Sequence, residues 1–256
     1  SEKDLCMCPK DLVKKITKRT KAVIYTQMNG RVGQIDKIAK ICRKRNIFLI
    51  EDVAHAIGSY IKNKHVGNHG IASSFSFSMP KLITMGQGGS VITNNLKLAK
   101  KLRLFKNFGR KKDGVDIHNY LGYNFKITDL QSILASSQLQ DIKKRMQLKK
   151  KIFLRYFQNL KKNKKIKILK MKNYETPWSV DIYAKNTKKL KKKLESKNIL
   201  TRYVYPPLNS QRIYKQIKGL PISNDYCKNG LWLPSSLDIK MTQIDKISSM
   251  INKFYK

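Results

Sequence analysis

The sequence predicts an α/β fold built on a parallel sheet, and three consecutive segments support that prediction. Residues 22–26 (AVIYT) and 47–50 (IFLI) are short β-branched and apolar runs of the kind that form buried strands. Between them, Ile35, Ile38 and Cys42 recur at helical spacing. A strand, a helix and a strand of these lengths form a βαβ unit, whose two strands run parallel and are buried.

The rest of the chain predicts a continuation of this domain and then a smaller one. The alternating run 72–78 predicts another strand, and Thr128 with Gln131 forms a capping box that opens a long helical stretch. We expect a large α/β domain over residues 1–150 and a small α+β domain over residues 151–256. The other expected elements are strands at 90–93, 166–169, 179–183 and 200–205, and helices at 98–105, 187–196 and 242–254.

Composition bounds the class of protein. A chain of 256 residues can bury a full core, and it contains no apolar run of membrane-spanning length. Its four cysteines lack the paired spacing of a zinc site, so we expect reduced thiols, no metal and a cytoplasmic location. The formal charge of +39 suggests nucleic-acid binding, yet only ten of the 55 basic residues are arginines and the lysines are spread along the chain. We therefore expect a solvated basic surface that attracts anionic substrates, with no specific nucleic-acid partner and no membrane partner.

Two residues near the carboxyl end of the predicted strand at 47–50 have side chains suited to catalysis. Asp52 lies just past the strand at 47–50, at the end where open α/β sheets bind ligands, although an aspartate here could equally cap the next turn. His55 lies three residues later, and a lone histidine is more often structural than catalytic.

The stretch SSFSFSMPKLITMGQGG, at residues 73–89, is a stronger signal. Its alternating serines and phenylalanines predict a strand with one hydroxyl face and one aromatic face, which breaks at Pro80 and presents Lys81 before a glycine-rich turn. A lysine held near a pocket can act as an amine nucleophile and form a Schiff base. Together with a carboxylate and with hydrogen-bond donors for a phosphate group, such a lysine suits pyridoxal 5′-phosphate (PLP) chemistry. The alternatives are a Schiff-base aldolase and a purely structural strand.

Several short motifs, taken in order and spacing, resemble the DegT/DnrJ/EryC1/StrS family of PLP-dependent sugar-nucleotide aminotransferases, from about residue 10 to the C-terminus. The resemblance implies an aspartate-aminotransferase-like (type I) PLP fold. The motifs are IEDVAHA (50–56), VGNHG (66–70), FSF through Lys81 (75–81), GQGG (86–89), GYNFKIT (122–128), YPPL (205–208) and LPS (233–235).

The resemblance implies a role for each site residue. Lys81 would be the catalytic lysine, which binds PLP as a Schiff base and later moves a proton between the amino donor and the cofactor. Asp52 would pair with the pyridine nitrogen, His55 would hydrogen-bond the cofactor near its O3′ oxygen, and Ser76 would bind its phosphate. Asn124 would reach the phosphate of the neighbouring subunit's cofactor, which implies a homodimer.

Some features depart from the family's pattern. Ile71, Lys126, Gln27 and Asn209 replace residues that are common in the family, and these changes affect substrate contacts more than the chemistry. The family has a further N-terminal segment that supplies a phosphate-binding turn and an aromatic ring stacked on the cofactor. Because this chain lacks that segment, we expect it to bind PLP weakly or not at all alone, unless another chain supplies the missing part.

The reaction that the resemblance implies is ping-pong amino transfer. Glutamate would convert PLP to pyridoxamine phosphate, which would then aminate a keto group of a nucleotide-diphosphate sugar for amino-sugar and polysaccharide biosynthesis. The NGR sequence at residues 29–31 resembles perosamine-synthetase-like members, which favours a 4-keto-6-deoxy sugar. The alternatives are a 3-keto sugar aminotransferase or a dehydratase of the same family, and, from another class, an inactive fragment or a basic polyanion-binding module. The family's dehydratases carry histidine where this chain has Lys81.

Overall fold

The computed structural model describes residues 1–214 and 219–256, and the chain divides into two compact units. The N-terminal unit consists of Cys6–Met28 and Val32–Lys143. The C-terminal unit consists of Lys144–Lys256 together with Ser1–Leu5 and Asn29–Arg31. The short stretch Asn29–Arg31 therefore interrupts the N-terminal unit and belongs to the other one.

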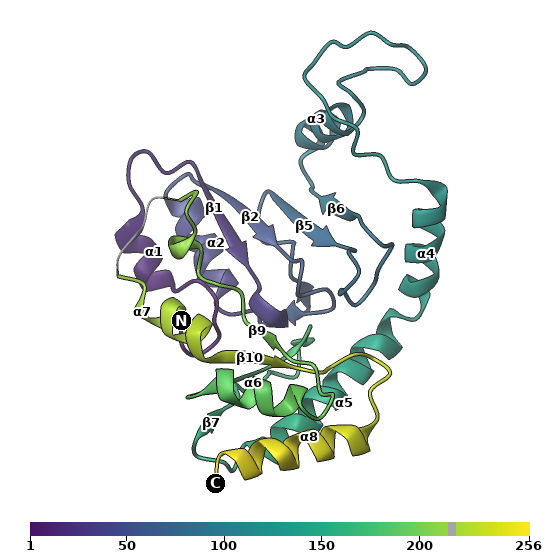
Figure 1. The fold of residues 1–256 in the computed structure, drawn as a ribbon. Helices are drawn as coiled ribbons and strands as arrows, with labels where there is room; N and C mark the ends of the chain where they lie inside the picture. The colour runs from purple at the N-terminus through teal and green to yellow at the C-terminus, as the bar shows by residue number, and fades with distance from the viewer. Residues whose placement is uncertain (215–218) are drawn as a thin grey trace. The chain divides into compact units, whose positions relative to one another are not determined.

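The N-terminal unit is built on a four-stranded sheet, which confirms the predicted βαβ unit (Figure 1). Strands β1 (Ala22–Thr26), β2 (Phe48–Asp52) and β5 (Ala72–Ser76) run parallel, and β6 (Gly89–Ile92) pairs antiparallel with β5. The strand order is β1-β2-β5-β6, and helix α2 (Ile35–Lys44) connects β1 to β2.

The core of the N-terminal unit lies between α2 and the sheet. The predicted helix positions Ile35, Ile38 and Cys42 are all buried in one cluster with Val23 and Leu49 from the strands. Two further elements of this unit were not predicted from the sequence. They are helix α1 (Pro9–Lys15), which begins at a proline, and the hairpin of β3 (Tyr60–Ile61) and β4 (Lys64–His65).

The long helical stretch predicted after Thr128 is confirmed, and the structure divides it into two consecutive helices. The predicted capping box is present at the start of α4 (Asp129–Gln140). Asp141 then takes φ −90° and ψ 8°, and α5 (Ile142–Leu160) begins after it. Aspartate is a weak helix former, and this turn separates the two helices.

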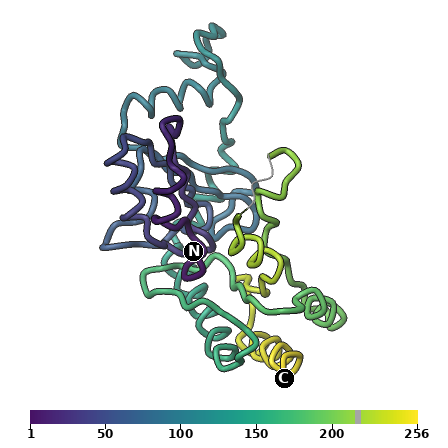
Figure 2. The backbone as a smooth tube through the Cα atoms, turned by 90° about the vertical axis from the view of Figure 1, so that its left-hand side faces the viewer, coloured from purple at the N-terminus to yellow at the C-terminus, as the bar shows by residue number. Residues whose placement is uncertain are grey.

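The segment between α3 (Leu96–Lys106) and α4 extends away from the sheet in both views of the N-terminal unit (Figures 1 and 2). Its backbone is tied to the end of α3, because the amides of Phe108 and Tyr123 donate to Tyr123 O and Phe105 O at 3.0 and 2.7 Å. Many of its apolar side chains are exposed, including Tyr120 and Phe125.

The C-terminal unit contains a second, antiparallel sheet. Its strand order is β7 (Ile166–Lys167), β8 (Val180–Ala184), β10 (Gly230–Leu233) and β9 (Arg202–Tyr203). Apolar residues of β8, β10 and three helices form one continuous core under this sheet. Strand β9 (Arg202–Tyr203) is shorter than the predicted strand 200–205 because only two residues pair with β10. The other elements are α6 (Thr187–Glu195), α7 (Pro221–Asn229) and α8 (Met241–Phe254).

No helix in the described part of the chain combines the length and apolarity needed to cross a bilayer.

Candidate active site

The carboxyl ends of the parallel strands lie at one edge of the N-terminal sheet, and Asp52 is the last residue of β2. Its partners in register are Thr26 on β1 and Ser74 on β5. Both carboxylate oxygens are held, because Thr26 Oγ1 donates to Oδ2 at 3.3 Å and the Ala54 amide donates to Oδ1 at 3.1 Å. Asp52 therefore caps the turn that follows β2, and it also stands where open α/β sheets bind ligands.

Lys81 and His55 interact electrostatically at this strand end. Lys81 is half-buried, and burial lowers the pKa of its amine, although the Asp52 carboxylate opposes part of that shift. Burial, and then the positive charge of Lys81, lower the pKa of His55 to about 3. His55 is therefore neutral near pH 7, and Lys81 loses its proton more readily than a surface lysine does.

Ser76 ends β5 next to the glycine-rich turn. It pairs in register with Gly89, and its hydroxyl lies 3.1 Å from Ser78 Oγ. A Cβ atom at Gly89 would lie 2.5 Å from the carbonyl oxygen of Phe75, so only glycine allows the turn to run this close to the strand. Two hydroxyls beside a closely packed backbone can donate hydrogen bonds to an anionic group.

Asn124 lies on a different part of the N-terminal unit. It is exposed, and it forms an isolated β-bridge with Asn107 at the end of α3. The amide of the next residue, Phe125, donates to Lys106 O at 3.0 Å. The structure thus groups Asp52 with the histidine and lysine predicted for the site, and it places Asn124 on the exposed segment before α4.

Glu51 was not given a role by the sequence, yet the structure places it next to Asp52 in a fully buried position. Its carboxylate accepts four hydrogen bonds, from Gln27 Nε2 (2.8 Å) and from the amides of Gly67 (2.8 Å), His69 (2.6 Å) and Gly70 (3.0 Å). Burial alone would raise the pKa of Glu51, but the His69 side chain and these amides lower it below its ordinary value. The carboxylate thereby holds the loop at 66–70 against the end of β2.

Glycine is required at Gly67 by both conformation and space. Its φ is +93°, and a Cβ atom there would lie 2.9 Å from Ser73 Oγ and 3.1 Å from the ring of Phe75. The sequence signal that could have identified Glu51 is therefore an acidic residue at the end of a buried strand that is followed downstream by this VGNHG sequence. A loop in which three amides turn towards one point needs an acceptor for them.

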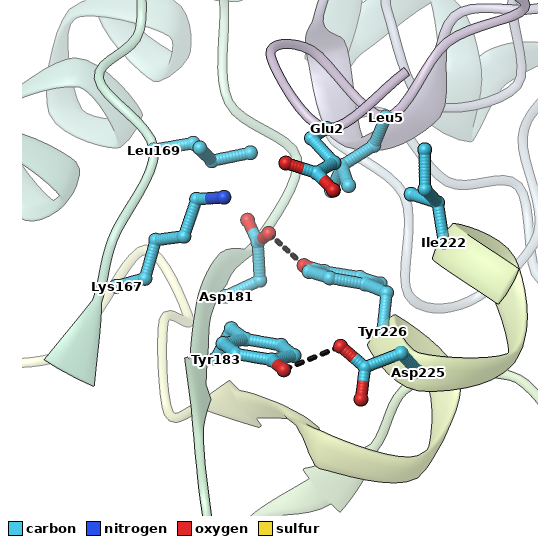
Figure 3. Close-up of a pocket in the computed structure, with 9 residues that line it drawn as sticks. All are labelled: Glu2, Leu5, Lys167, Leu169, Asp181, Tyr183, Ile222, Asp225 and Tyr226. Carbon is cyan, nitrogen blue, oxygen red and sulfur yellow. Dashed lines mark hydrogen bonds between the residues drawn. The ribbon is translucent and has the colours of Figure 1, made fainter. Parts of the chain in front are cut away.

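A separate cavity of about 200 Å³ lies within the C-terminal unit (Figure 3). Asp181 projects into it and accepts hydrogen bonds from Tyr226, from Asn29 Nδ2 at 2.5 Å and from the guanidinium of Arg31 at 2.8 Å. Arg31 and Asp181 are each only 2% exposed, so this is a buried ion pair. It anchors the stretch Asn29–Arg31 in this unit, and none of the predicted site residues lines the cavity.

A mixed sheet with a carboxylate, a neutral histidine and a half-buried lysine near its strand ends fits the type I PLP fold that the sequence predicts. The model of the DegT/DnrJ/EryC1/StrS aminotransferase family matches residues 1–252. The chain belongs to this aminotransferase family, and the resemblance seen in its motifs is confirmed.

Curated relatives and solved structures agree with this assignment. GDP-perosamine synthase of Escherichia coli O157:H7 is 32% identical over 255 residues, which cover 97% of this chain and 70% of that protein. The UDP-4-amino-4,6-dideoxy-N-acetyl-beta-L-altrosamine transaminase of Helicobacter pylori is 30% identical over 257 residues, covering 96% of this chain and 68% of that protein. The structure of Helicobacter pylori PseC, an aminotransferase involved in the biosynthesis of pseudoaminic acid, superposes with a TM-score of 0.92 at 28% identity, covering 99% of this chain and 71% of that one.

Proposed function

We propose that the protein is a PLP-dependent aminotransferase that moves an amino group from glutamate to a keto group of a nucleotide-diphosphate sugar, with a 4-keto-6-deoxy sugar favoured. The observation that carries this proposal is the half-buried Lys81 beside Asp52 at the strand ends of a chain that matches an aminotransferase family over residues 1–252. The names of the two curated relatives, a perosamine synthase and a transaminase of a 4-amino-4,6-dideoxy sugar, support the choice of sugar.

The residues at the strand ends fit the chemical groups of PLP. A basic pyridine nitrogen suits the Asp52 carboxylate, which Thr26 and Ala54 fix in place. An aldehyde suits the amine of Lys81, and a phosphate suits the hydroxyl of Ser76 beside the glycine-rich turn. When bound, PLP would accept the amino group and delocalise the negative charge that develops on the substrate carbon.

Each side chain has a defined task in this scheme. Lys81 supplies the amine nucleophile and then carries the proton, and its lowered pKa makes the neutral amine available closer to pH 7. Asp52 holds a proton on the ring nitrogen because its negative charge favours the protonated form. His55 can hydrogen-bond a cofactor oxygen without adding charge, since burial and Lys81 keep it neutral.

Chemical labelling tests the role of Lys81. Because this chain alone is expected to bind PLP weakly, the folded chain is incubated with a large excess of PLP. Borohydride reduction and peptide mapping should then place the label on Lys81. Lys81→Ala should lose that label, whereas Lys97→Ala, at an exposed position on α3, should keep it. Labelling of other lysines to the exclusion of Lys81 would contradict the mechanism.

Product analysis tests the substrate. With glutamate as donor, the protein should aminate GDP- or UDP-linked 4-keto-6-deoxy sugars, and the position of the new amine identifies which carbon reacted. Amination of a 3-keto sugar alone, or loss of water from the sugar without amino transfer, would replace the favoured substrate class by one of the alternatives.

We also propose that the active form is a homodimer, formed through the exposed apolar segment that contains Asn124. Residues 115–139 include only three charged residues, Asp116, Lys126 and Asp129, in a chain that carries a formal charge of +39. Two such positively charged chains repel each other least where the surfaces that meet carry few lysines. The side chains that such a contact would cover are more than half exposed, and they include Ile117, Leu121, Leu130, Ile133 and Leu134.

Mass measurement in solution tests the homodimer. The chain should sediment as a dimer at micromolar concentration, and Ile133→Glu with Leu134→Glu should shift it to a monomer. Lys97→Glu, a charge change outside this segment, is the matched control and should leave the mass unchanged. A monomeric wild-type chain, or a dimer that tolerates both glutamates, would exclude this interface.

A further inference from the structure

Lys81 lies at the start of a loop that is closed by hydrogen bonds at its far end. The amide of Met85 donates to Phe77 O at 2.9 Å, and the Phe77 amide donates to Gly88 O at 2.9 Å. Thr84 Oγ1 also donates to Phe77 O at 3.3 Å. The position of the lysine backbone therefore depends on how firmly residues 84–88 are held.

Two glutamines of α4 hold that end of the loop. The Thr84 amide donates to Gln138 Oε1 at 3.1 Å, and Gln138 Nε2 donates back to Thr84 O at 2.8 Å. One side-chain amide thus pairs with both main-chain groups of a single residue, 54 positions earlier in the sequence. Two turns earlier on α4, Gln131 Nε2 donates to Gln87 O at 2.9 Å.

The position of these glutamines on α4 is unusual for a helix of a globular protein. The half-buried side chains of α4 are Gln131, Ser132, Ala135 and Gln138, whereas its leucines and isoleucine are more than half exposed. Amphipathic helices ordinarily bury their apolar face. The face of α4 that turns towards the Lys81 loop is instead its polar face, so the contact with the loop is made by directed hydrogen bonds.

We infer that Gln138, supported by Gln131, is a positioning residue for Lys81, because its paired hydrogen bonds to Thr84 fix the loop that keeps the lysine amine beside Asp52. This inference rests on the proposed function, in which Lys81 is the reacting amine. It adds a residue that neither the motifs nor the strand-end group identifies. The carboxylate of Asp52 acts on the charge of the lysine, and the lysine in turn acts on His55.

The test compares Gln138→Met with Gln140→Met. Methionine keeps the length of glutamine but cannot pair with Thr84, and Gln140 is an exposed glutamine on the same helix that serves as the matched control. The lysines are acylated with a limiting amine reagent across pH 6 to 11, and peptide mapping gives a titration midpoint for each. This readout needs neither PLP nor catalytic activity.

In Gln138→Met the loop loosens, so the titration midpoint of Lys81 should rise towards the value of exposed lysines. The acylation rate of Lys81 at high pH, where the rate no longer changes with pH, should increase several-fold. The midpoint of Lys149, in the C-terminal unit, should not move. Hydrogen exchange of the peptide 78–88 should accelerate in Gln138→Met and keep the wild-type rate in Gln140→Met.

An unchanged Lys81 midpoint in folded Gln138→Met, or an equal change in Gln140→Met, would overturn the inference. A protein in which Gln138 controls the Lys81 midpoint but PLP does not label Lys81 would retain the positioning role and refute the proposed function. The two failures are therefore distinguishable.

Discussion

Replacement of Glu51 by glutamine should loosen the loop at 66–70 and destabilise the N-terminal unit. Each oxygen of the Glu51 carboxylate accepts two of its four hydrogen bonds. Glutamine keeps one oxygen and presents an NH₂ group to the other two donors. Hydrogen bonds to a charged group contribute about 1.5–3 kcal/mol each, so the loss of two costs roughly 3–6 kcal/mol before relief from burying a charge. We expect the free energy of unfolding to fall by about 3 kcal/mol in total.

Hydrogen exchange measures this loss at the residues concerned. A loss of about 3 kcal/mol corresponds to roughly hundredfold faster exchange, since each 1.4 kcal/mol is a factor of ten. The peptide that contains the amides of Gly67 and Gly70 should show this acceleration in Glu51→Gln. Asp141→Asn, an exposed acidic position in the same unit, should change unfolding by less than about 0.5 kcal/mol. Glu51→Gln that matches wild type in both measurements would refute the structural role of the carboxylate.

The same carboxylate predicts an acid dependence with a definite sign. Because the folded pKa of Glu51 is lowered from 4.5, the unfolded chain binds a proton first as the pH falls. The stability that Glu51 contributes is therefore present above about pH 4.5 and is lost as the pH falls through the lower folded value. Glu51→Gln should remove this part of the acid dependence, and an unchanged acid profile would contradict the assignment.

Three further predictions concern other buried groups. Arg31→Leu leaves the buried Asp181 without its guanidinium and should destabilise the C-terminal unit by about 3–5 kcal/mol in urea unfolding. Arg155→Leu breaks an exposed ion pair and should change the free energy of unfolding far less, and equal losses in the two variants would contradict this contrast. Burial lowers the pKa of Lys149 from 10.5 to about 8, so wild-type stability should rise between pH 8 and 10.5, and Lys149→Met should abolish that rise. The imidazole NMR signal of His55 can be assigned by its absence in His55→Gln. Because the pKa of His55 is about 3, this signal should not titrate between pH 5 and 8. A midpoint near 6.5 would show that the His55 side chain is not buried as described.

The parallel part of the sheet could be predicted from the sequence because its periodicity is local. The segments 22–26 and 47–50 have the composition of buried strands, and the helix between them has one apolar face. Asp52 follows from the same argument, since a residue at the end of such a strand must lie at the ligand-binding edge. Lys81 required the motif around it, because lysine is too abundant in this chain to be informative alone.

Other parts of the fold and site depend on contacts between residues distant in sequence. Glu51 acquires its role only when the loop at 66–70 folds over it, and a single glutamate before an aspartate carries no sign of that. Arg31 likewise belongs to the C-terminal unit because Asp181, 150 positions later, binds it. The break at Asp141 was missed because the capping box marks the start of a helix, and a weak helix former inside a continuous pattern does not by itself mark an end.

Helix α4 shows why amphipathic periodicity alone cannot say which face of a helix is buried. Leu130, Ile133 and Leu134 lie on one side of this helix and Gln131 and Gln138 on another, and the usual interpretation puts the leucines inside. In this chain the two glutamines are half-buried instead, because Thr84 and Gln87 present main-chain groups that need partners. The leucines are then left for a second surface, which the proposed homodimer would supply. If that surface covers α4, it also restrains the helix that holds the Lys81 loop, so dissociation of the dimer should accelerate hydrogen exchange in the peptide 78–88 even though no residue of that loop has been changed.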